Sequence, residues 1–367
     1  MGTLFDYLEW RGDLPFEQVP ANEVDSLIFS LLSYVDLNGI VSDSHADSPI
    51  SLQAVANTFF ARHPDGKNIS LGLIIPKGIV KLFQKVKECK RFRSVGIKAY
   101  VNRVDLTEQT QFSAMTFVLS KNRAMIAYRG TDDTVIGWKE NFNMSFMPVV
   151  PAQIHAAEYL NDAADHLSGK LYVTGHSKGG NLSVYAGVNC RPDVRERLLS
   201  VWSNDGPGFG KGTLTDPLYL DARHLIHTLV PKSSVIGMLL EHDENYTVVS
   251  SRQTGLLQHD GMTWNVSGGS FVHLQTISEE SKRTDRTLNR WINEMSPEQR
   301  EQFSEAIYRL FSAGNTLTLT EWVNLKKHPP TRNLDPQVRK TISKMLTTLL
   351  SENAKEWFNE MFRKQEK

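Results

Sequence analysis

The 367-residue chain has little cysteine, no excess charge of either sign and no long apolar run. It has only two cysteines, Cys89 and Cys190, and neither has a partner at metal-ligand spacing; this usage suits a reducing compartment without a disulfide framework. Lys plus Arg and Asp plus Glu both number 41, so the basic excess of a nucleic-acid-binding protein is missing. No segment approaches the length of a membrane span, and the acidic start at residues 1–9 is unlike a secretory signal. We therefore expect a soluble, cytoplasmic protein that binds no nucleic acid.

One stretch has the pattern of an exposed, reactive serine. Residues 171–173 suit a buried strand, and an apolar helix follows from Leu182. Between them lies a Gly-x-Ser-x-Gly turn composed of Gly175, His176, Ser177, Lys178 and Gly179. A strained strand–turn–helix holds a serine as a nucleophile, and its glycines avoid collisions with neighbouring elements. The helix that begins after the serine favours negative charge at the site. We predict that Ser177 is the nucleophile.

The pattern along the chain divides it into three blocks. Residues 1–93 are predicted to be helical, either as a cap or as a scaffold, with Asn22 and Pro76 at helix starts. Strands that alternate with helices across 94–276 predict a mostly parallel sheet covered by helices on both faces. Residues 277–367 return to a helical pattern. There the predicted helix starts are a capping box at 296–299 and Asp335-Pro336. The predicted strands are 95–104, 112–119, 124–128, 171–173, 198–203, 225–230, 246–250 and 263–266.

A serine nucleophile needs a base, and the base needs an orienting group. His259 lies in a glycine-flanked loop between the last two predicted strands, and His273 is the rival base. Asp205 follows the strand 198–203, at the same sheet edge as Ser177, which favours it as the orienting acid. Asp243, after the next strand, is the alternative acid. Asp260 adjoins His259 in sequence, where a side chain seldom reaches the ring beside it.

Two N–H groups are needed for the oxyanion of the tetrahedral intermediate. The residue after the nucleophile supplies one, so the backbone of Lys178 is expected to be a donor. The loop Arg129-Gly130-Thr131 ends an early predicted strand, and Thr131 is the candidate for the second donor. Large apolar residues follow in a stretch that is predicted to be a loop. This loop either forms a flap over an apolar substrate or packs inward. The apolar residues are Trp138, Phe142, Met144, Phe146 and Met147.

These blocks together resemble the class 3, or fungal-type, lipases. Those enzymes carry Arg-Gly-Thr followed by a tryptophan, here residues 129–131 and Trp138, and Gly-His-Ser-x-Gly-Gly, here residues 175–180. The whole chain resembles a family of bacterial cytosolic lipase-like α/β-hydrolases of unknown function. The resemblance implies an α/β-hydrolase fold, with Ser177 as nucleophile and Thr131 and Lys178 at the oxyanion hole. One departure is a serine, within residues 230–236, where class 3 lipases carry their acid; pancreatic-type lipases place it one strand earlier, as at Asp205.

The sequence therefore predicts a serine hydrolase that cleaves a carboxylic ester, on a small molecule or a lipid, with no cofactor and no metal. The expected site is Ser177, His259 and Asp205 with the N–H groups of Thr131 and Lys178. A thioesterase or amidase would use the same residues. A third alternative is a non-catalytic binding protein on a hydrolase scaffold, which the serine at the acid position and the helical additions favour.

Overall fold

The computed structural model describes residues 2–64, 69, 75–76, 78–210, 212–243, 245–279, 281–282, 295–312 and 315–325. Its centre is a nine-stranded sheet in the order β1-β2-β3-β4-β5-β6-β7-β8-β11. Strands β4 to β8 run parallel, whereas β1 to β4 pair antiparallel and β11 is antiparallel to β8. The strands are β1 (Ile50–Ser51), β2 (Gly96–Asp105), β3 (Thr110–Ser120), β4 (Arg123–Tyr128), β5 (Lys170–His176), β6 (Leu198–Asn204), β7 (Ile226–Pro231), β8 (Tyr246–Val249) and β11 (His273–Leu274). The short strands β9 (Val266–Ser267) and β10 (Ser270–Phe271) form a separate hairpin.

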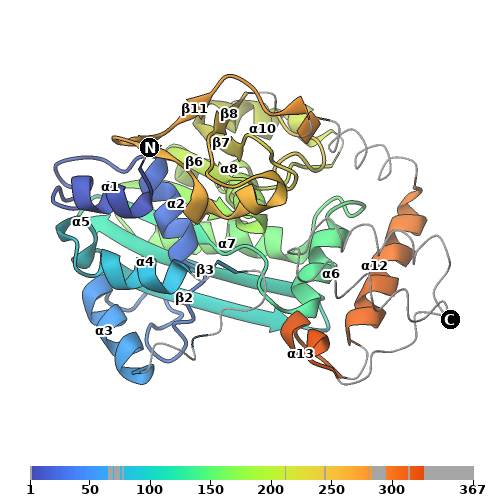
Figure 1. Cartoon of the computed structure of the whole chain (residues 1–367), viewed down its shortest axis with the longest axis horizontal. Coiled ribbons are helices and arrows are strands. Elements are labelled where there is room, and N and C mark those ends of the chain that lie inside the picture. Colours follow the sequence, from blue (N-terminus) through green and yellow to red (C-terminus); the bar gives the residue numbers. More distant parts are fainter. Residues whose placement is uncertain are drawn as a thin grey trace.

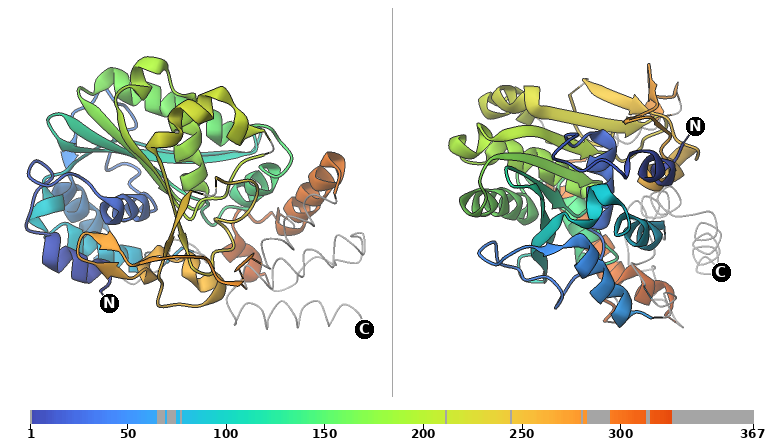
Figure 2. Two further views of the ribbon diagram at one scale, coloured as in Figure 1. Left: turned by 90° about the horizontal axis from the view of Figure 1, so that it is seen from above. Right: turned by 90° about the vertical axis from the view of Figure 1, so that its left-hand side faces the viewer.

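Helices cover both faces of the sheet (Figures 1 and 2). One face is covered by the N-terminal helices α1 (Leu4–Arg11), α2 (Glu23–Leu32), α3 (Leu52–Arg62), α4 (Gly78–Val86) and α5 (Lys90–Arg93). The other face is covered by α7 (Pro151–His166), α8 (Lys178–Asn189), α9 (Pro192–Arg195) and α10 (Pro217–Ala222). This arrangement, with a strand–turn–helix at Ser177, confirms the predicted α/β-hydrolase class.

Helix α2 is the element of the N-terminal block that lies deepest in the protein. Residues 24–32 are all buried, and the helix packs against β5 and β6. Phe29 contacts the ring of Phe117 on β3, with centroids 4.5 Å apart, and also Phe16 and Phe92. One apolar cluster therefore joins the N-terminal helices to the sheet, and burial of this surface stabilises both.

A buried set of small polar residues brings α2 close to the sheet beneath the serine turn. The Asn204 side chain, at the end of β6, donates hydrogen bonds to Thr174 Oγ1 (3.2 Å) and to the carbonyl of Gly175 (3.1 Å). The hydroxyl oxygen of Ser30, on α2, lies 2.8 Å from Thr174 Oγ1. Because these side chains are short and hydrogen-bonded to one another, the helix approaches the sheet without leaving buried polar atoms unpaired.

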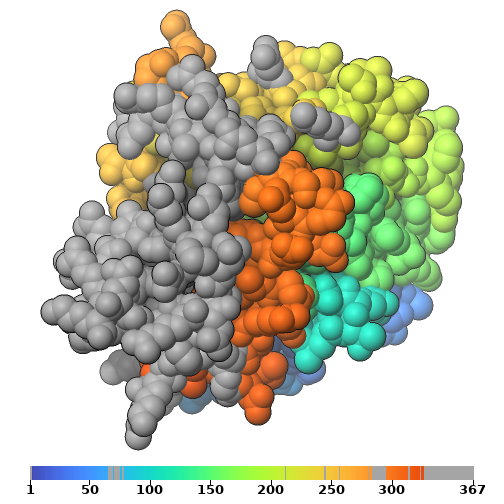
Figure 3. Space-filling model, turned by 90° about the vertical axis from the view of Figure 1, so that its right-hand side faces the viewer, coloured from blue at the N-terminus to red at the C-terminus, as the bar shows by residue number. Residues whose placement is uncertain are grey.

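The C-terminal segment packs beside the loop that follows β4. Helix α12 (Pro297–Ser312) lies against α6 (Val135–Asn143), as Figure 3 also shows. Lys139 Nζ is 2.6 Å from Glu305 Oε2, and the rings of Phe142 and Phe303 meet edge to face. Helix α13 (Leu319–Val323) follows, and its first N–H, at Leu319, donates to the carbonyl of Asp133 (2.8 Å). These contacts attach the segment directly after Thr131.

Most predicted elements are present with shifted ends, and two expectations are wrong. The strand predicted at 263–266 is largely replaced by the 3₁₀ turn η4 (Gly261–Thr263), which Asp260 caps; only Val266 is in a strand, β9, and the edge of the sheet is β11. The stretch that begins at Trp138 was expected to be a loop, but residues 135–143 form helix α6, capped by Thr134. The capping box at 296–299 is present, with Ser296 N–H donating to Gln299 Oε1 at 2.8 Å. The helix predicted from Asp335 lies outside the described residues, and the division into three blocks stays a prediction. Within the described part of the chain, no helix has the length and apolarity to span a membrane.

We predict that Phe29→Ala lowers the free energy of unfolding by about 3–5 kcal/mol, because it opens a cavity between α2 and the sheet. Urea titration measures this change. Leu106→Ala is the matched control: Leu106 is 55% exposed, and the expected change is within about 0.5 kcal/mol. Equal effects from the two substitutions would contradict the placement of α2 in the core.

Candidate active site

Ser177 sits in the strained turn between β5 and α8. Its φ of 58° and ψ of −132° lie outside the regions that most residues adopt, and its side chain is partly exposed. A Cβ on Gly175 would lie 1.9 Å from the carbonyl oxygen of Gly179, and a Cβ on Gly179 would lie 2.2 Å from that of Tyr128. Only glycine fits at both positions, so the spacing of the motif follows from steric contact.

Asp205 and His259 are brought together although 54 residues separate them. Asp205 follows β6, is fully buried and has a φ of 52°. Its Oδ2 lies 2.6 Å from Nδ1 of His259, at the end of the short 3₁₀ helix η3 (Gly255–His259). The His259 side chain is 26% exposed. A buried carboxylate that accepts from one ring nitrogen fixes the tautomer and leaves Nε2 to act as a base.

Ser234, which follows β7, completes the surroundings of Asp205. Its hydroxyl donates to Asp205 Oδ1 at 2.5 Å, and the Gly237 N–H donates to the same oxygen at 3.1 Å. The stretch in which the resemblance expects an acid therefore contributes a hydrogen-bond donor to an acid from the preceding strand. In the sequence this serine is visible as a departure from the lipase pattern, and that departure does not predict a contact with Asp205.

His176 supports His259 from the turn. The two rings lie tilted against each other with centroids 4.7 Å apart, and Nε2–H of His176 donates to the backbone carbonyl of His259 at 2.8 Å. Burial, followed by the charge of His259, lowers the pKa of His176 to about 3. His176 is therefore neutral near pH 7. Its Nδ1 lies 3.4 Å from the hydroxyl of Tyr34, in the segment after α2. Sequence reasoning treated His176 only as part of the turn.

The loop at Gly130 and Thr131 lies against Ser177. A Cβ on Gly130 would lie 3.0 Å from Ser177 Cβ and 2.6 Å from the carbonyl oxygen of His176. Thr131 is buried, and its Oγ1 accepts a hydrogen bond from Asn141 Nδ2 at 2.5 Å. Lys178 begins α8 beside the serine, with its side chain directed into the interior. The backbone of Lys178 follows the nucleophile directly, and that of Thr131 follows Gly130, which lies against Ser177.

The remaining candidates make other contacts. Asp243 pairs with Arg223, and His273 Nε2 lies 2.8 Å from Glu23 Oε1. Asp260 accepts a hydrogen bond from the N–H of Met262 and so begins a short helical turn. Among the described residues, no group of three or more His, Cys, Asp or Glu side chains is arranged to hold a metal ion.

The sheet, the strained serine turn and the Asp205–His259 pair define a protein of α/β-hydrolase class. The chain belongs to the Mbeg1-like family, whose model matches residues 86–309. That range begins at the end of α4 and covers Ser177, His259, Asp205, Thr131 and Lys178.

Three lipases of known structure are similar to this chain at low identity. The M37 lipase is 14% identical, with a TM-score of 0.36, over 74% of this chain and 80% of that lipase. A fungal lipase–inhibitor complex is 15% identical with a TM-score of 0.33, over 61% and 78% of the two chains. The Rhizomucor miehei lipase–propeptide complex is 14% identical with a TM-score of 0.33, over 61% and 80%. A comparison of the sequence with curated proteins finds no match.

We predict that His176→Gln flattens the pH dependence of stability. The unfolded chain binds a proton at His176 below about pH 6.5, whereas the folded protein does so only below about 3. Wild-type stability therefore falls as the pH drops through this window, by up to about 1.4 kcal/mol per pH unit from this residue. Gln keeps a donor for the His259 carbonyl but does not titrate.

Urea unfolding at several pH values between 4 and 7 measures the difference between the two slopes. His45 and His227, whose pKa values burial also lowers, remain in both proteins, so a residual slope is expected. Identical slopes would show that His176 is not a buried neutral imidazole.

We predict that Ser234→Ala destabilises the protein by about 1.5–3 kcal/mol, because the buried Asp205 carboxyl group loses a hydrogen-bond donor. The neighbouring Ser233→Ala is the control, since within the described residues the Ser233 hydroxyl bonds to the partly buried Ser278 hydroxyl, at 3.2 Å, and not to a buried charge. The measurement is the urea midpoint of each variant. A loss no larger than that of the control would contradict the role given to Ser234.

Proposed function

We propose that this protein is a serine hydrolase that cleaves a carboxylic ester through an acyl-enzyme on Ser177. The observation that carries the proposal is the 2.6 Å hydrogen bond between buried Asp205 and His259, beside a strained serine turn. A turn of this kind is costly to hold, and such strain concentrates at functional sites. The acid that orients His259 provides a second requirement of nucleophilic catalysis, a base that is held in position.

In the first half of the reaction, Nε2 of His259 takes the Ser177 proton while the serine oxygen bonds to the ester carbonyl carbon. The carbonyl π electrons move to the oxygen, which becomes the oxyanion of a tetrahedral intermediate. When the intermediate collapses, the bond to the alcohol oxygen breaks and His259 gives that oxygen its proton. Asp205 keeps the imidazole ring oriented and stabilises its positive charge during these steps.

The N–H groups of Thr131 and Lys178 are the proposed donors to the oxyanion. Their support is the position of Lys178 next to Ser177 and of Thr131 next to Gly130, which lies against Ser177, together with the start of α8 at the serine, since a helix N-terminus favours negative charge. In the second half, His259 removes a proton from water, which attacks the acyl carbon. Ser177 then leaves with a proton from His259, and the product is the carboxylic acid.

Both a small-molecule ester and a lipid fit the proposal. Because the same residues would also open a thioester or an amide, turnover of p-nitrophenyl esters, acyl thioesters and peptides by the full chain is the comparison that ranks them.

We predict that a fluorophosphonate probe adds once to the wild-type protein and not to Ser177→Ala. The probe reacts only with a serine whose proton a base removes. Intact-protein mass measures the adduct, and peptide mapping locates it. Thermal unfolding of Ser177→Ala shows whether its fold is retained. An adduct of equal yield on folded Ser177→Ala would sink the proposal.

The two candidate acids provide a matched pair for the same assay. Asp205→Asn is expected to slow labelling at least about a hundredfold, because the histidine loses its orienting carboxylate. Asp243→Asn removes a carboxylate of the same type that pairs with Arg223 instead, so labelling at the wild-type rate is expected. The reverse order would assign the acid to Asp243.

A further inference from the structure

A buried ion pair lies directly behind the serine turn and is not used by the proposed chemistry. Lys178 Nζ is 2.8 Å from Glu140 Oε2, and the two side chains are at most 1% exposed. Lys178 Nζ also donates to the carbonyl of Gln111 on β3, at 2.6 Å. Lys178, whose backbone N–H is one of the two proposed oxyanion donors, therefore has its side chain bound to α6.

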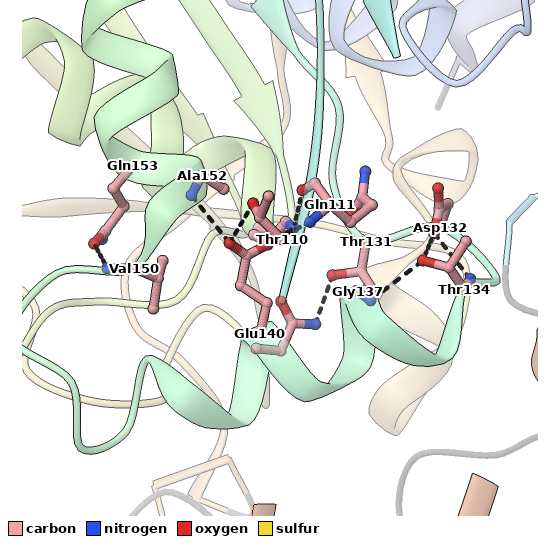
Figure 4. A network of polar contacts seen from close by, with 12 residues as sticks. Thr110, Gln111, Thr131, Asp132, Thr134, Gly137, Glu140, Val150, Ala152 and Gln153 are labelled. Carbon is pink, nitrogen blue, oxygen red and sulfur yellow. Dashed lines mark hydrogen bonds and ion pairs between the residues drawn. The ribbon is translucent and has the colours of Figure 1, made fainter. Parts of the chain in front are cut away.

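Glu140 gathers donors from several elements around it, as Figure 4 shows in part. Its Oε1 accepts from Thr110 Oγ1 (2.8 Å) and from the N–H of Ala152 in the first turn of α7 (3.0 Å). Its Oε2 accepts from the N–H of Gln111 (3.0 Å) as well as from Lys178. Four donors around one carboxylate satisfy its lone pairs and fix α6 relative to β3, α7 and α8.

The next residue of α6 holds the other side of the proposed oxyanion hole. Asn141 Nδ2 donates to Thr131 Oγ1 at 2.5 Å, so the loop that carries the second N–H is attached to the same helix. At the start of α6, Asp132 Oδ1 accepts from the N–H of Thr134 (2.9 Å), and Thr134 Oγ1 accepts from that of Gly137 (3.2 Å). The loop and the helix thus form one hydrogen-bonded unit (Figure 4).

We propose that Glu140 and Lys178 are positioning residues, which set the separation between the two oxyanion N–H groups of the proposed hydrolase. The inference rests on the proposed function of Ser177. One end of the ion pair lies on the helix that holds Thr131, and the other belongs to the residue that provides the second N–H. The pair therefore bridges the two halves of the hole through the interior, without touching substrate.

A purely stabilising role explains this arrangement less well. Taking two charges out of water costs about as much as their attraction returns, and apolar side chains of similar size often stabilise a protein as well. Hydrogen-bond donors to an oxyanion, by contrast, depend on position, and a shift of about 1 Å can cost about a hundredfold in rate. The hydrogen bonds of a buried charged pair are directional and hold its two ends at a fixed separation, whereas apolar contacts have no such direction.

The test separates stability from rate with a double variant, Lys178→Met with Glu140→Gln. Each single substitution leaves a buried charge unpaired, so the double variant should unfold at a higher temperature than either single one. Its labelling of Ser177 by the fluorophosphonate, and kcat on any ester turned over, should remain about tenfold to a hundredfold below wild type, with KM unchanged. Labelling that returns to the wild-type rate together with stability would overturn the proposal.

The buried Arg91–Asp25 pair of the N-terminal block is the matched control, with both side chains fully buried and 2.5 Å between them. Arg91→Met with Asp25→Asn removes the same kinds of charge from a pair that bonds to neither half of the proposed oxyanion hole, and the folded protein should label within about twofold of wild type. If labelling of this control slowed as much as labelling of the Lys178 and Glu140 double variant, lost stability would explain both effects, and the proposal would be overturned.

Asn141→Ala tests the same idea without removing a buried charge, should the double variant not fold. It detaches α6 from Thr131, so slower labelling at unchanged KM is expected, and the wild-type rate would overturn the proposal. A wild-type protein that takes no adduct at Ser177 would overturn the proposed function, and this inference with it. Normal wild-type labelling with unaffected variants would overturn this inference alone.

Discussion

The backbone contact between β4, β5 and α8 at the serine turn is the constraint on which the rest of the structure depends. With Cβ positions at Gly175 and Gly179 only 1.9 and 2.2 Å from neighbouring carbonyl oxygens, the three elements meet with no space for side chains. This contact strains Ser177, places Gly130 against its Cβ and starts α8 at Lys178. A nucleophile, an adjoining donor loop and a helix N-terminus therefore follow from one steric condition.

The N-terminal helices support the strands behind the serine turn. Helix α2 fits against β5 because Ser30, Thr174 and Asn204 are small and hydrogen-bonded, which keeps the strand behind the turn rigid. Tyr34 then reaches the buried His176, and His176 in turn supports His259. On the opposite side, α12 and α13 pack on α6 and on the residues after Thr131. The helical additions at both ends thus contact the elements that carry the candidate site.

The candidate acid shows how a site can be rearranged without changing its geometry. Asp205 projects from the end of β6, while Ser234, after β7, donates to its carboxyl group. Because neighbouring parallel strands end at the same edge, an acid on either one can reach the same histidine. The strand without the acid then provides a hydrogen-bond donor, which a buried carboxyl group requires.

The sequence by itself determined strands β2 to β8 and the glycine-spaced turn that holds Ser177, because these depend on periodicity and on residues a few positions apart. It ranked Asp205 and His259 first, but left Asp243 and His273 open. Only the tertiary structure brought the first pair together and paired the others with Arg223 and Glu23. It also made a helix of the stretch expected to be a loop after Thr134, where packing against α12 outweighs local preference. The roles of His176, Ser234 and Glu140 rest on contacts between residues 29 to 83 positions apart, which local patterns do not encode.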